Sequence, residues 1–281
     1  MVPETSGTQA TLRGRVCVLA GGTGGLGAFV ARQLHAEGAL LVLGYRHDRA
    51  RAEALKEELE GSGQAPVGLV GGDIADESVR ESVLLAAREL GTIYGLVVLV
   101  GNPARPSGPA PTQAELEFSF RQNYLGPVML ARAFGAEMAA ARSGGAIVLI
   151  SSMQGVEPFE GSIGYAGPKA AILHAARVMA KEWGGHADVR VNVVAPGVTS
   201  VGMAEASIRQ GKYDRFLERG VIRRFGRAED VARAIRFFLE PDSYVTGQVL
   251  TVDGGLTLRR DVAAVSPARL EPDSSTPRAG N

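Results

Sequence analysis

Tyr165 and Lys169 lie four residues apart in the segment SIGYAGPKAA, residues 162–171, and this spacing suits proton transfer. Residues four apart on a helix share one face, so both side chains would point into the same cleft. A free tyrosine has a pKa of about 10, and a nearby ammonium lowers it by favouring the phenolate. The pair therefore predicts a general acid/base. The alternative interpretation is two surface residues on a helix that begins with a proline.

A glycine-rich loop, AGGTGGLG, follows the apolar run VCVLA and precedes a helical pattern at residues 25–37. Glycine is needed where the backbone turns sharply, or where no Cβ fits between the main chain and a pyrophosphate. The helix that follows offers free N–H groups and the positive end of its dipole to phosphates. The order of strand, loop and helix predicts a dinucleotide site, and the alternative is a purely structural turn.

The end of the second apolar run indicates which dinucleotide is preferred. Tyr45 and Arg46 stand where NAD-binding folds usually carry an acidic residue for the ribose 2′-hydroxyl. A guanidinium pairs with a 2′-phosphate, which a carboxylate would repel, so we expect NADP(H) to be preferred over NAD(H). In the alternative interpretation, Arg46, His47 and Arg49 form a solvated helix start. Asp73, at the end of the third run, could accept a hydrogen bond from the adenine amino group.

The elements that would position these residues alternate along the chain. Apolar runs rich in Val and Leu occur at residues 16–20, 40–44, 67–71, 96–100, 146–151, 189–195 and 248–253. They are apolar on consecutive residues, which is typical of parallel strands buried on both faces. Helical patterns lie between them at residues 25–37, 48–60, 76–90, 113–141, 163–183 and 228–239. This alternation predicts an α/β protein with a doubly wound sheet and right-handed crossovers.

Length and composition narrow the class of protein. The chain has 281 residues, 45% hydrophobic and 21% charged, which suits one large α/β domain or two small ones with a sizeable core. No internal linker and no second core are visible, so one domain is expected. Lys plus Arg and Asp plus Glu are 30 each, so we expect no nucleic-acid or membrane partner. A single Cys17, no long apolar run and no signal core indicate a cytoplasmic protein. We expect residues 1–11 to be flexible and residues 258–281 to be a disordered tail. No cluster has metal-ligand spacing, so no metal is expected.

Taken in order, the motifs resemble those of the short-chain dehydrogenase/reductase family across residues 12–257. The matching features are the glycine loop, with Ala20 in the Thr place, Asp73, Asn123 in QNYLGPV, Ser152 thirteen residues before Tyr165, Tyr165-x-x-x-Lys169, APG at 195–197 and VDGG at 252–255. The C-terminal pattern RFGRAEDVARAIRFFL…YVTGQVLTVDGG looks most like the 3-oxoacyl-[acyl-carrier-protein] reductase branch.

The resemblance implies a single Rossmann-type domain with a seven-stranded parallel sheet. It also implies hydride transfer between nicotinamide and a small carbonyl compound or secondary alcohol. Tyr165 would donate the proton, Ser152 would orient the carbonyl oxygen, Lys169 would hold the nicotinamide ribose, and Asn123 would hold a water that links Lys169 to solvent. The implied cofactor-binding residues are Gly21, Thr23, Gly25, Leu26, Gly27, Tyr45, Arg46, Asp73, Ile74, Gly101, Asn102, Tyr165, Lys169, Pro196, Gly197 and Val198. Family members are commonly tetramers, so a homotetramer or homodimer is expected, with helices 113–141 and 163–183 at an interface.

The sequence departs from the family at two places. The fourth strand of the family ends in Asn-Asn-Ala-Gly, whereas this chain has VLVG at residues 98–101. Asn102 follows one residue later and is the candidate substitute. The family's Thr after Pro-Gly aligns near Val201, and Thr199 or Ser200 is the candidate replacement.

Two functions are consistent with these residues. The first is an NADP(H)-dependent reductase or alcohol dehydrogenase, with 3-oxoacyl thioesters as the leading substrates and polyketide-type, sugar-alcohol or steroid-like substrates open. The second is a catalytically silent nucleotide-binding protein that acts in sensing or assembly. The altered fourth strand permits the second function, while the intact Ser152, Tyr165 and Lys169 argue against it. Residues 201–225 occupy the family's lid region, and Met203, Tyr213, Phe216 and Leu217 within it suggest an apolar cover.

Overall fold

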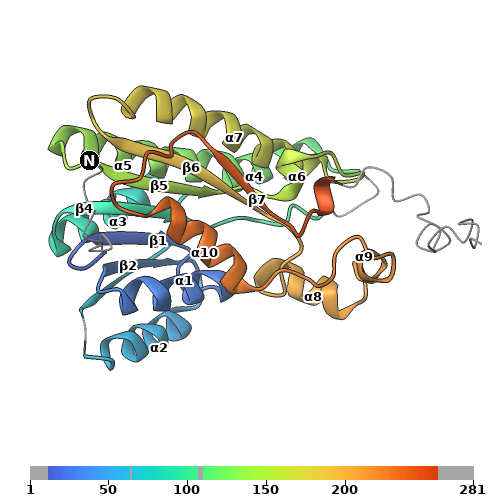
Figure 1. Ribbon diagram of the computed structural model, residues 1–281, viewed down its shortest axis with the longest axis horizontal. Helices are drawn as coiled ribbons and strands as arrows, with labels where there is room; N and C mark the ends of the chain where they lie inside the picture. Colours follow the sequence, from blue (N-terminus) through green and yellow to red (C-terminus); the bar gives the residue numbers. More distant parts are fainter. Residues whose placement is uncertain (1–11, 64, 107–109, 259–281) are drawn as a thin grey trace, which may run out of the picture.

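The computed structural model describes residues 12–63, 65–106 and 110–258. Its centre is a seven-stranded sheet in the order β3-β2-β1-β4-β5-β6-β7, with all neighbouring strands parallel (Figure 1). The strands are β1 (Val16–Ala20), β2 (Leu40–Tyr45), β3 (Val67–Gly71), β4 (Ile93–Val98), β5 (Gly145–Ile150), β6 (Val189–Pro196) and β7 (Val249–Val252). The predicted seven-stranded, doubly wound α/β fold is confirmed. The strand order reverses between β1 and β4, which is where such sheets bind ligands.

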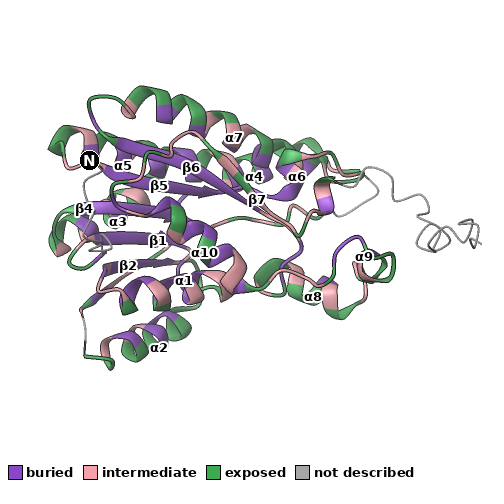
Figure 2. Cartoon of the chain, in the orientation of Figure 1, coloured by how far each residue is buried: buried purple, intermediate pink, exposed green. Residues whose placement is uncertain are grey.

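Helices form one layer on each face of the sheet. One face carries α1 (Gly25–Ala36), α2 (Arg49–Glu60) and α10 (Ala228–Phe238), and the other carries α3 (Glu77–Leu90), α5 (Gly126–Ala141) and α7 (Ile163–Trp183). Figure 2 shows the strands buried between these layers, which explains why they are apolar on consecutive residues. Within the described ranges, no helix combines the length and hydropathy that crossing a membrane requires.

The tails expected at residues 1–11 and 258–281 lie outside the described residues, apart from Leu258. That residue ends a short 3-10 helix, η3 (Leu256–Leu258), which follows the last strand.

The fourth strand differs from its predicted position. It begins at Ile93 and ends at Val98, whereas the apolar run predicted a strand at residues 96–100. The Leu99 N–H still donates to Ala20 O at 2.8 Å, and the chain then leaves the sheet. Leu99 and Val100 nevertheless pack against the two cores. The run therefore stays apolar past the end of the strand, and an apolar run alone could not locate that end.

The segment predicted as one helix at residues 113–141 is interrupted. It consists of α4 (Gln113–Phe120), a π-helical segment, η1 (Arg121–Leu125), and α5. A π-helical turn inserts one residue into the helix and rotates the side chains that follow, and it occurs often at functional sites. Asn123, within η1, is fully buried.

The predicted lid region folds into short helices beyond the carboxyl ends of the strands (Figure 1). They are η2 (Gly202–Ala204), α8 (Glu205–Arg209) and α9 (Asp214–Glu218), and they face α6 (Met153–Val156), which follows β5. Phe216 lies in an apolar cluster with Met153, and Tyr213 and Leu217 pack against it. Met203 is 46% exposed. The region therefore forms an apolar cover for which Phe216 is the buried anchor.

Gly135 on α5 marks a close approach to α7. A Cβ at Gly135 would lie 2.1 Å from Trp183 Cζ3, so Gly135→Ala requires the two helices to shift. We predict that this variant lowers the free energy of unfolding by about 1–3 kcal/mol, as measured by denaturant unfolding. Gly167→Ala on α7 is the matched control, because its Cβ would meet nothing within 4 Å. The control should gain up to about 1 kcal/mol from helix propensity. Similar losses in both variants would contradict this interpretation.

Candidate active site

The predicted site residues come together at the carboxyl edge of the sheet. The glycine loop follows β1, Tyr45 ends β2 and Arg46 comes next, Asp73 and Ile74 follow β3, and Gly101 and Asn102 follow β4. Ser152 follows β5, Pro196 ends β6, and Gly197 and Val198 come next. Parallel strands all end at the same edge, so residues far apart in sequence become neighbours there. The N-terminal turns of α7 bring Tyr165 and Lys169 to the same edge.

Lys169 is buried beside Tyr165. The two residues lie one turn apart on α7, with Lys169 Nζ 5.8 Å from the centroid of the Tyr165 ring. Nζ donates a hydrogen bond of 2.9 Å to Ile150 O, at the end of β5. Only 2% of Lys169 is exposed, and this burial lowers its pKa to about 8. The amine can therefore exchange a proton near neutral pH.

Tyr165 has a pKa shifted in the opposite direction to the one expected. Burial raises its pKa to about 12, a hydrogen bond with Ser152 opposes that rise, and the phenol of Tyr213 in the lid adds to it. We expected the neighbouring ammonium to lower this pKa. In the protein alone burial dominates, because it penalises the phenolate and also weakens the charge on Lys169. Tyr165 is therefore held in its protonated, donor form.

Two adjacent serines, which follow β5, make different contacts. Ser151 Oγ donates to Lys169 O at 2.7 Å and so fixes α7 against the strand. Ser152 caps α6, where its Oγ accepts from the Gln154 N–H at 3.2 Å. The same Ser152 side chain interacts with the Tyr165 hydroxyl. Of the two serines, Ser152 is therefore the one that contacts Tyr165, and Ser151 contacts the backbone of α7.

Pro168 leaves one carbonyl of α7 without a helical donor. Helix α7 begins at Ile163, within the predicted range, and Pro168 lies just beyond its first turn. Proline has no N–H, so the carbonyl of Gly164, four residues earlier, lacks its usual partner. Ser119 Oγ on α4 donates to that oxygen at 2.5 Å and accepts from Asn123 Nδ2 at 2.9 Å. The proline therefore provides the acceptor that ties α4 to α7.

Asn123 fixes the chain that follows β4. Its Oδ1 accepts from the Asn102 N–H at 2.8 Å, and its Nδ2 donates to Asn102 O at 2.9 Å. The Asn102 side chain accepts instead from the Ala104 N–H at 2.8 Å, in a turn where Ala104 has φ 48°. A Cβ at Gly101 would lie 3.1 Å from Asn123 Oδ1 and 3.4 Å from Lys169 Nζ. Asn102 is thus held through its backbone, and glycine leaves room between the two buried polar groups.

The glycine loop forms a cradle that a side chain would fill. Gly21 has φ +83°, and a Cβ on Gly27 would lie only 2.2 Å from Gly21 O. Thr23 is buried in the loop, and α1 begins at Gly25. A Cβ on Gly25 would lie 3.4 Å from Val201 Cβ and from Gly202 N, so the segment after β6 lies against the first turn of α1. The surface at this turn carries free N–H groups of the kind that bind a pyrophosphate. Residues Leu26 and Gly27 continue the helix away from this surface.

Arg46 and Asp73 are paired with each other, although the sequence assigned them to different parts of a nucleotide. Arg46 Nη2 lies 2.8 Å from Asp73 Oδ2. Asp73 also accepts from Gln122 Nε2 and from the Ala75 N–H, each at 2.9 Å. Partial burial would raise the pKa of this carboxyl, but these hydrogen bonds and the Arg46 charge lower it overall. Asp73 is therefore ionised and fully engaged.

Thr199 and Ser200, the candidate replacements for the missing threonine, both donate hydrogen bonds to backbone carbonyls. Thr199 Oγ1 donates to Gly197 O at 3.2 Å, and Ser200 Oγ donates to Gly226 O at 3.1 Å. Gly197 itself is closely packed, since a Cβ there would lie 2.6 Å from Asp253 Cβ. Thr199 is buried. These hydroxyls hold the loop after β6 in place.

Sequence reasoning missed three polar residues near the site. Ser119 lies four residues before Asn123, so helical spacing could have placed it on the same face. Gln122 contacts Asp73 from within the π-helical segment, which hydrophobic spacing does not predict. Tyr213 was noted only as an apolar lid residue, yet its phenol influences Tyr165.

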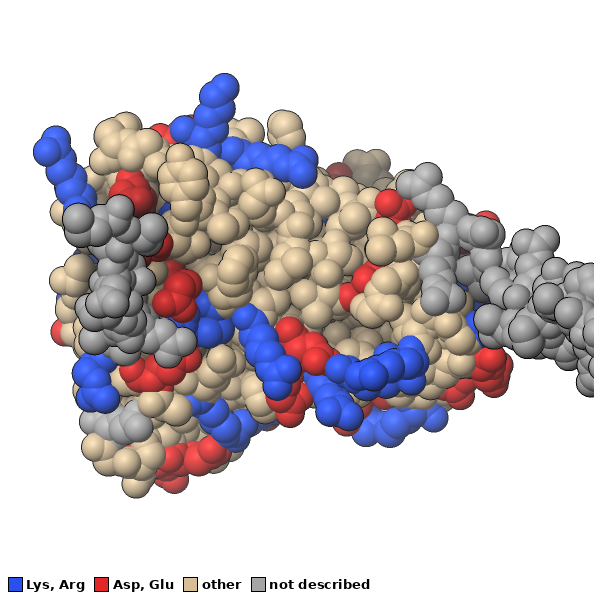
Figure 3. All heavy atoms as spheres, in the orientation of Figure 1, with Lys and Arg blue, Asp and Glu red and all other residues tan. Residues whose placement is uncertain are grey.

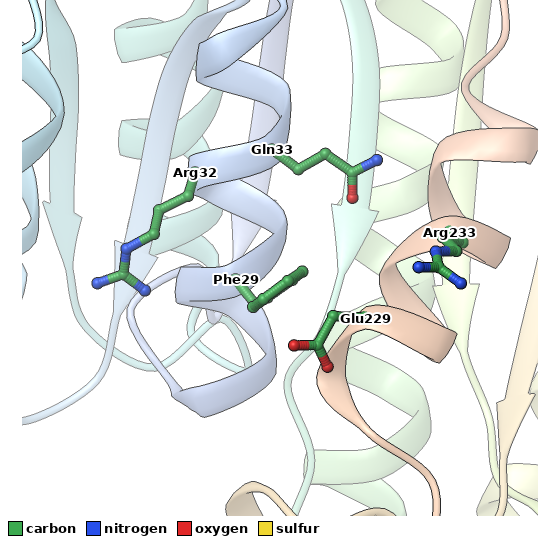
Figure 4. A pocket seen from close by; sticks show the side chains of 5 residues that line it. All are labelled: Phe29, Arg32, Gln33, Glu229 and Arg233. Atoms are coloured by element: carbon green, nitrogen blue, oxygen red, sulfur yellow. The ribbon is translucent and has the colours of Figure 1, made fainter.

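A separate hollow of about 380 Å³ lies between α1 and α10 (Figure 4). It is lined by Phe29, Arg32, Gln33, Glu229 and Arg233. These two helices cover the face of the sheet opposite α7, so this hollow is distinct from the site at Tyr165.

The burial of Lys169 makes stability depend on pH. Its pKa is about 8 in the folded protein against a usual 10.5, so the unfolded chain binds more protons between these values and stability rises with pH there. Below about pH 8, burial of the charged ammonium lowers the free energy of unfolding by roughly 3 kcal/mol. We predict that Lys169→Met has a higher free energy of unfolding than the wild type at neutral pH. The gain is at most this amount, reduced by the loss of the hydrogen bond to Ile150 O. The advantage should shrink towards pH 10.5.

Denaturant unfolding of both proteins at neutral pH and near pH 10 would test this prediction. A variant less stable than the wild type at neutral pH, or a difference that does not change with pH, would contradict it.

Known proteins resemble this chain over most of its length. The family described as enoyl-(acyl carrier protein) reductase matches residues 20–257. Acetoacetyl-CoA reductase of Synechocystis sp. is 32% identical over 250 residues, covering 86% of this chain and 96% of its own. Galactitol 2-dehydrogenase (L-tagatose-forming) of Cereibacter sphaeroides is 32% identical over 262 residues, covering 89% and 98%. A short-chain type dehydrogenase/reductase from Mycobacterium ulcerans has a structure that matches with a TM-score of 0.81 and 28% identity, covering 89% and 92%.

These relatives act on different substrates by their names, so their identity to this chain indicates the type of reaction rather than the substrate. The match at residues 20–257 spans the glycine loop, Ser152, Tyr165 and Lys169. Together with the sheet order and the geometry of those residues, it places the chain in the short-chain dehydrogenase/reductase family of oxidoreductases.

Proposed function

We propose that this chain is an NADP(H)-dependent oxidoreductase that transfers hydride between nicotinamide and a carbonyl compound or secondary alcohol. The observation that carries this proposal is the meeting of Ser152, Tyr165 and buried Lys169 at the strand edge that also bears the glycine cradle. Bound cofactor would supply the hydride, and the protein would supply orientation and the proton.

In the reductive direction, Tyr165 donates its proton to the carbonyl oxygen. Burial keeps Tyr165 protonated in the protein alone, with a pKa of about 12. Ser152, which already interacts with that hydroxyl, hydrogen-bonds the same carbonyl oxygen and orients it. Positioned acid/base groups of this kind typically contribute about 10²–10⁴ in rate.

Lys169 and Asn123 would return the proton to Tyr165 from solvent. Gly101 leaves a space bordered by Asn123 Oδ1 and Lys169 Nζ. We propose that a water near these two polar atoms relays the proton. The pKa of Lys169, about 8, suits an amine that passes protons near neutral pH. Lys169 would also hold the nicotinamide ribose.

The preference for NADP(H) rests on Arg46. This guanidinium, rather than a carboxylate, ends β2, and its side chain is 42% exposed. A 2′-phosphate would find a bidentate cationic partner there.

The substrate class we favour is a 3-oxoacyl thioester. Among the lid residues 201–225, six are Lys or Arg and three are Asp or Glu, whereas the whole chain is balanced at 30 each. Figure 3 shows Lys and Arg side chains, with Asp and Glu side chains among them, on this part of the surface. Carriers of acyl thioesters bear phosphate groups, which a basic lid would attract. The similarity to an acetoacetyl-CoA reductase supports the same class.

We further propose that the chain assembles as a homotetramer or homodimer through α4, α5 and α7. These helices expose large apolar side chains, including Phe118 at 47%, Ile163 at 68% and Val178 at 43%. Such side chains would be covered at a helical interface.

The experiment that tests the catalytic proposal measures NADPH oxidation across a panel of carbonyl compounds that includes 3-oxoacyl thioesters. We predict that Tyr165→Phe lowers kcat by about 10²–10⁴ because the proton donor is lost. Tyr94→Phe is the matched control, since Tyr94 is a tyrosine whose hydroxyl donates to Leu239 O, away from the site. A Tyr165→Phe enzyme with wild-type turnover, or a wild type that turns over no member of the panel, would count against the proposal.

A further inference from the structure

We propose that the ion pair between Arg46 and Asp73 must open when the nucleotide binds, and that this exchange of partners strengthens the preference for NADPH over NADH. The inference rests on the proposed NADP(H)-dependent function. It concerns the adenosine end of the cofactor site, where the two residues follow the neighbouring strands β2 and β3.

The ion pair and a bound nucleotide compete for the same groups. Asp73 Oδ2 pairs with Arg46 Nη2 at 2.8 Å and accepts a hydrogen bond from Gln122 Nε2 at 2.9 Å. Asp73 Oδ1 accepts a hydrogen bond from the Ala75 N–H. An adenine amino group would be a fourth donor to this carboxylate. A 2′-phosphate would meet a neutral pair instead of a free cation, with the negative Asp73 close by. The 2′-phosphate therefore gains full contact only when Arg46 leaves Asp73, and until then the adenine amino group has to share the carboxylate with Arg46.

Arg46 is the partner that moves. The Asp73 side chain is 22% exposed and is also held by Gln122 and Ala75, whereas the Arg46 side chain is 42% exposed. Among the described residues, Asp73 provides the one ion pair of Arg46. A long side chain tethered at one point can swing out at little cost to the fold.

The exchange affects the two nucleotides differently. NADPH brings a phosphate that replaces Asp73 as the partner of Arg46, so the lost ion pair is recovered. NADH brings no such group, and Arg46 is left without its partner. Partly exposed ion pairs contribute modestly, so opening this pair should weaken NADH binding by roughly two- to five-fold.

The test is equilibrium titration of the whole protein with NADPH and with NADH, followed by calorimetry or protein fluorescence. Arg46→Gln should bind NADH about two- to five-fold more tightly than the wild type, because no ion pair has to open. The same variant should bind NADPH more weakly, because the phosphate loses its cation. Asp73→Asn should bind NADPH more tightly, since Arg46 is released and the amide oxygen still accepts hydrogen bonds.

Glu58→Gln is the matched control. Glu58 forms an ion pair with Arg32 at 2.6 Å, between α2 and α1, so its substitution makes the same change in charge away from Asp73 and Gln122. This control should leave the affinities for NADPH and NADH unchanged if the effect comes from the Arg46–Asp73 pair rather than from the overall charge of the protein. The double variant Arg46→Gln/Asp73→Asn should bind NADH no more tightly than Arg46→Gln, because the same pair is already absent.

Two results would overturn the inference while leaving the proposed function intact. In the first, the wild type prefers NADPH and Arg46→Gln binds NADH as weakly as the wild type does. In the second, Asp73→Asn lowers the affinities for both nucleotides equally, as expected if Asp73 only binds adenine. If Asp73→Asn does not fold, the exposed Arg46→Gln variant alone decides. A wild type that binds neither nucleotide, or that prefers NADH, would reject the proposed cofactor and the inference with it.

Discussion

The buried amine of Lys169 is the constraint on which the rest of the site depends. It lies against the end of β5 with Ile150 O as its acceptor, and burial lowers its pKa to about 8. A group of this kind is unfavourable for stability unless the surrounding structure holds it firmly. The bond from Ser151 Oγ to Lys169 O and the close contact between Gly135 and Trp183 provide that support. The site is thus maintained by packing that stabilises an otherwise unfavourable residue.

The π-helical segment η1 connects the two ends of the proposed cofactor site. Three consecutive residues point to three different anchors: Arg121 to Asp76, Gln122 to Asp73, and Asn123 to the backbone of Asn102. Asn123 is linked in turn through Ser119 to the carbonyl that Pro168 leaves free on α7. The adenosine end and the acid/base pair therefore share one rigid segment. A regular helix would direct these side chains differently, because each extra residue rotates those that follow it.

Much of this arrangement could be predicted from the sequence, and the exceptions have physical causes. Strands buried on both faces give long apolar runs, so the sheet, the glycine loop and the start of α7 were placed correctly. The end of β4 was misplaced because Leu99 still packs against the core outside the sheet, and the π-helical turn leaves no trace in hydrophobic spacing. The Arg46–Asp73 pair and the raised pKa of Tyr165 depend on side-chain contacts and burial in three dimensions. Motifs identify such residues singly and do not reveal how they are paired.

The central claim is that burial holds Tyr165 protonated until a positive cofactor ring lies beside it. The most direct measurement is the tyrosinate absorbance of the wild type minus that of Tyr165→Phe, recorded against pH with and without NADP⁺. The account predicts a midpoint near 12 for the protein alone and a clearly lower midpoint when NADP⁺ is bound. A midpoint that NADP⁺ does not move, measured under conditions where the nucleotide is shown to bind, would contradict it.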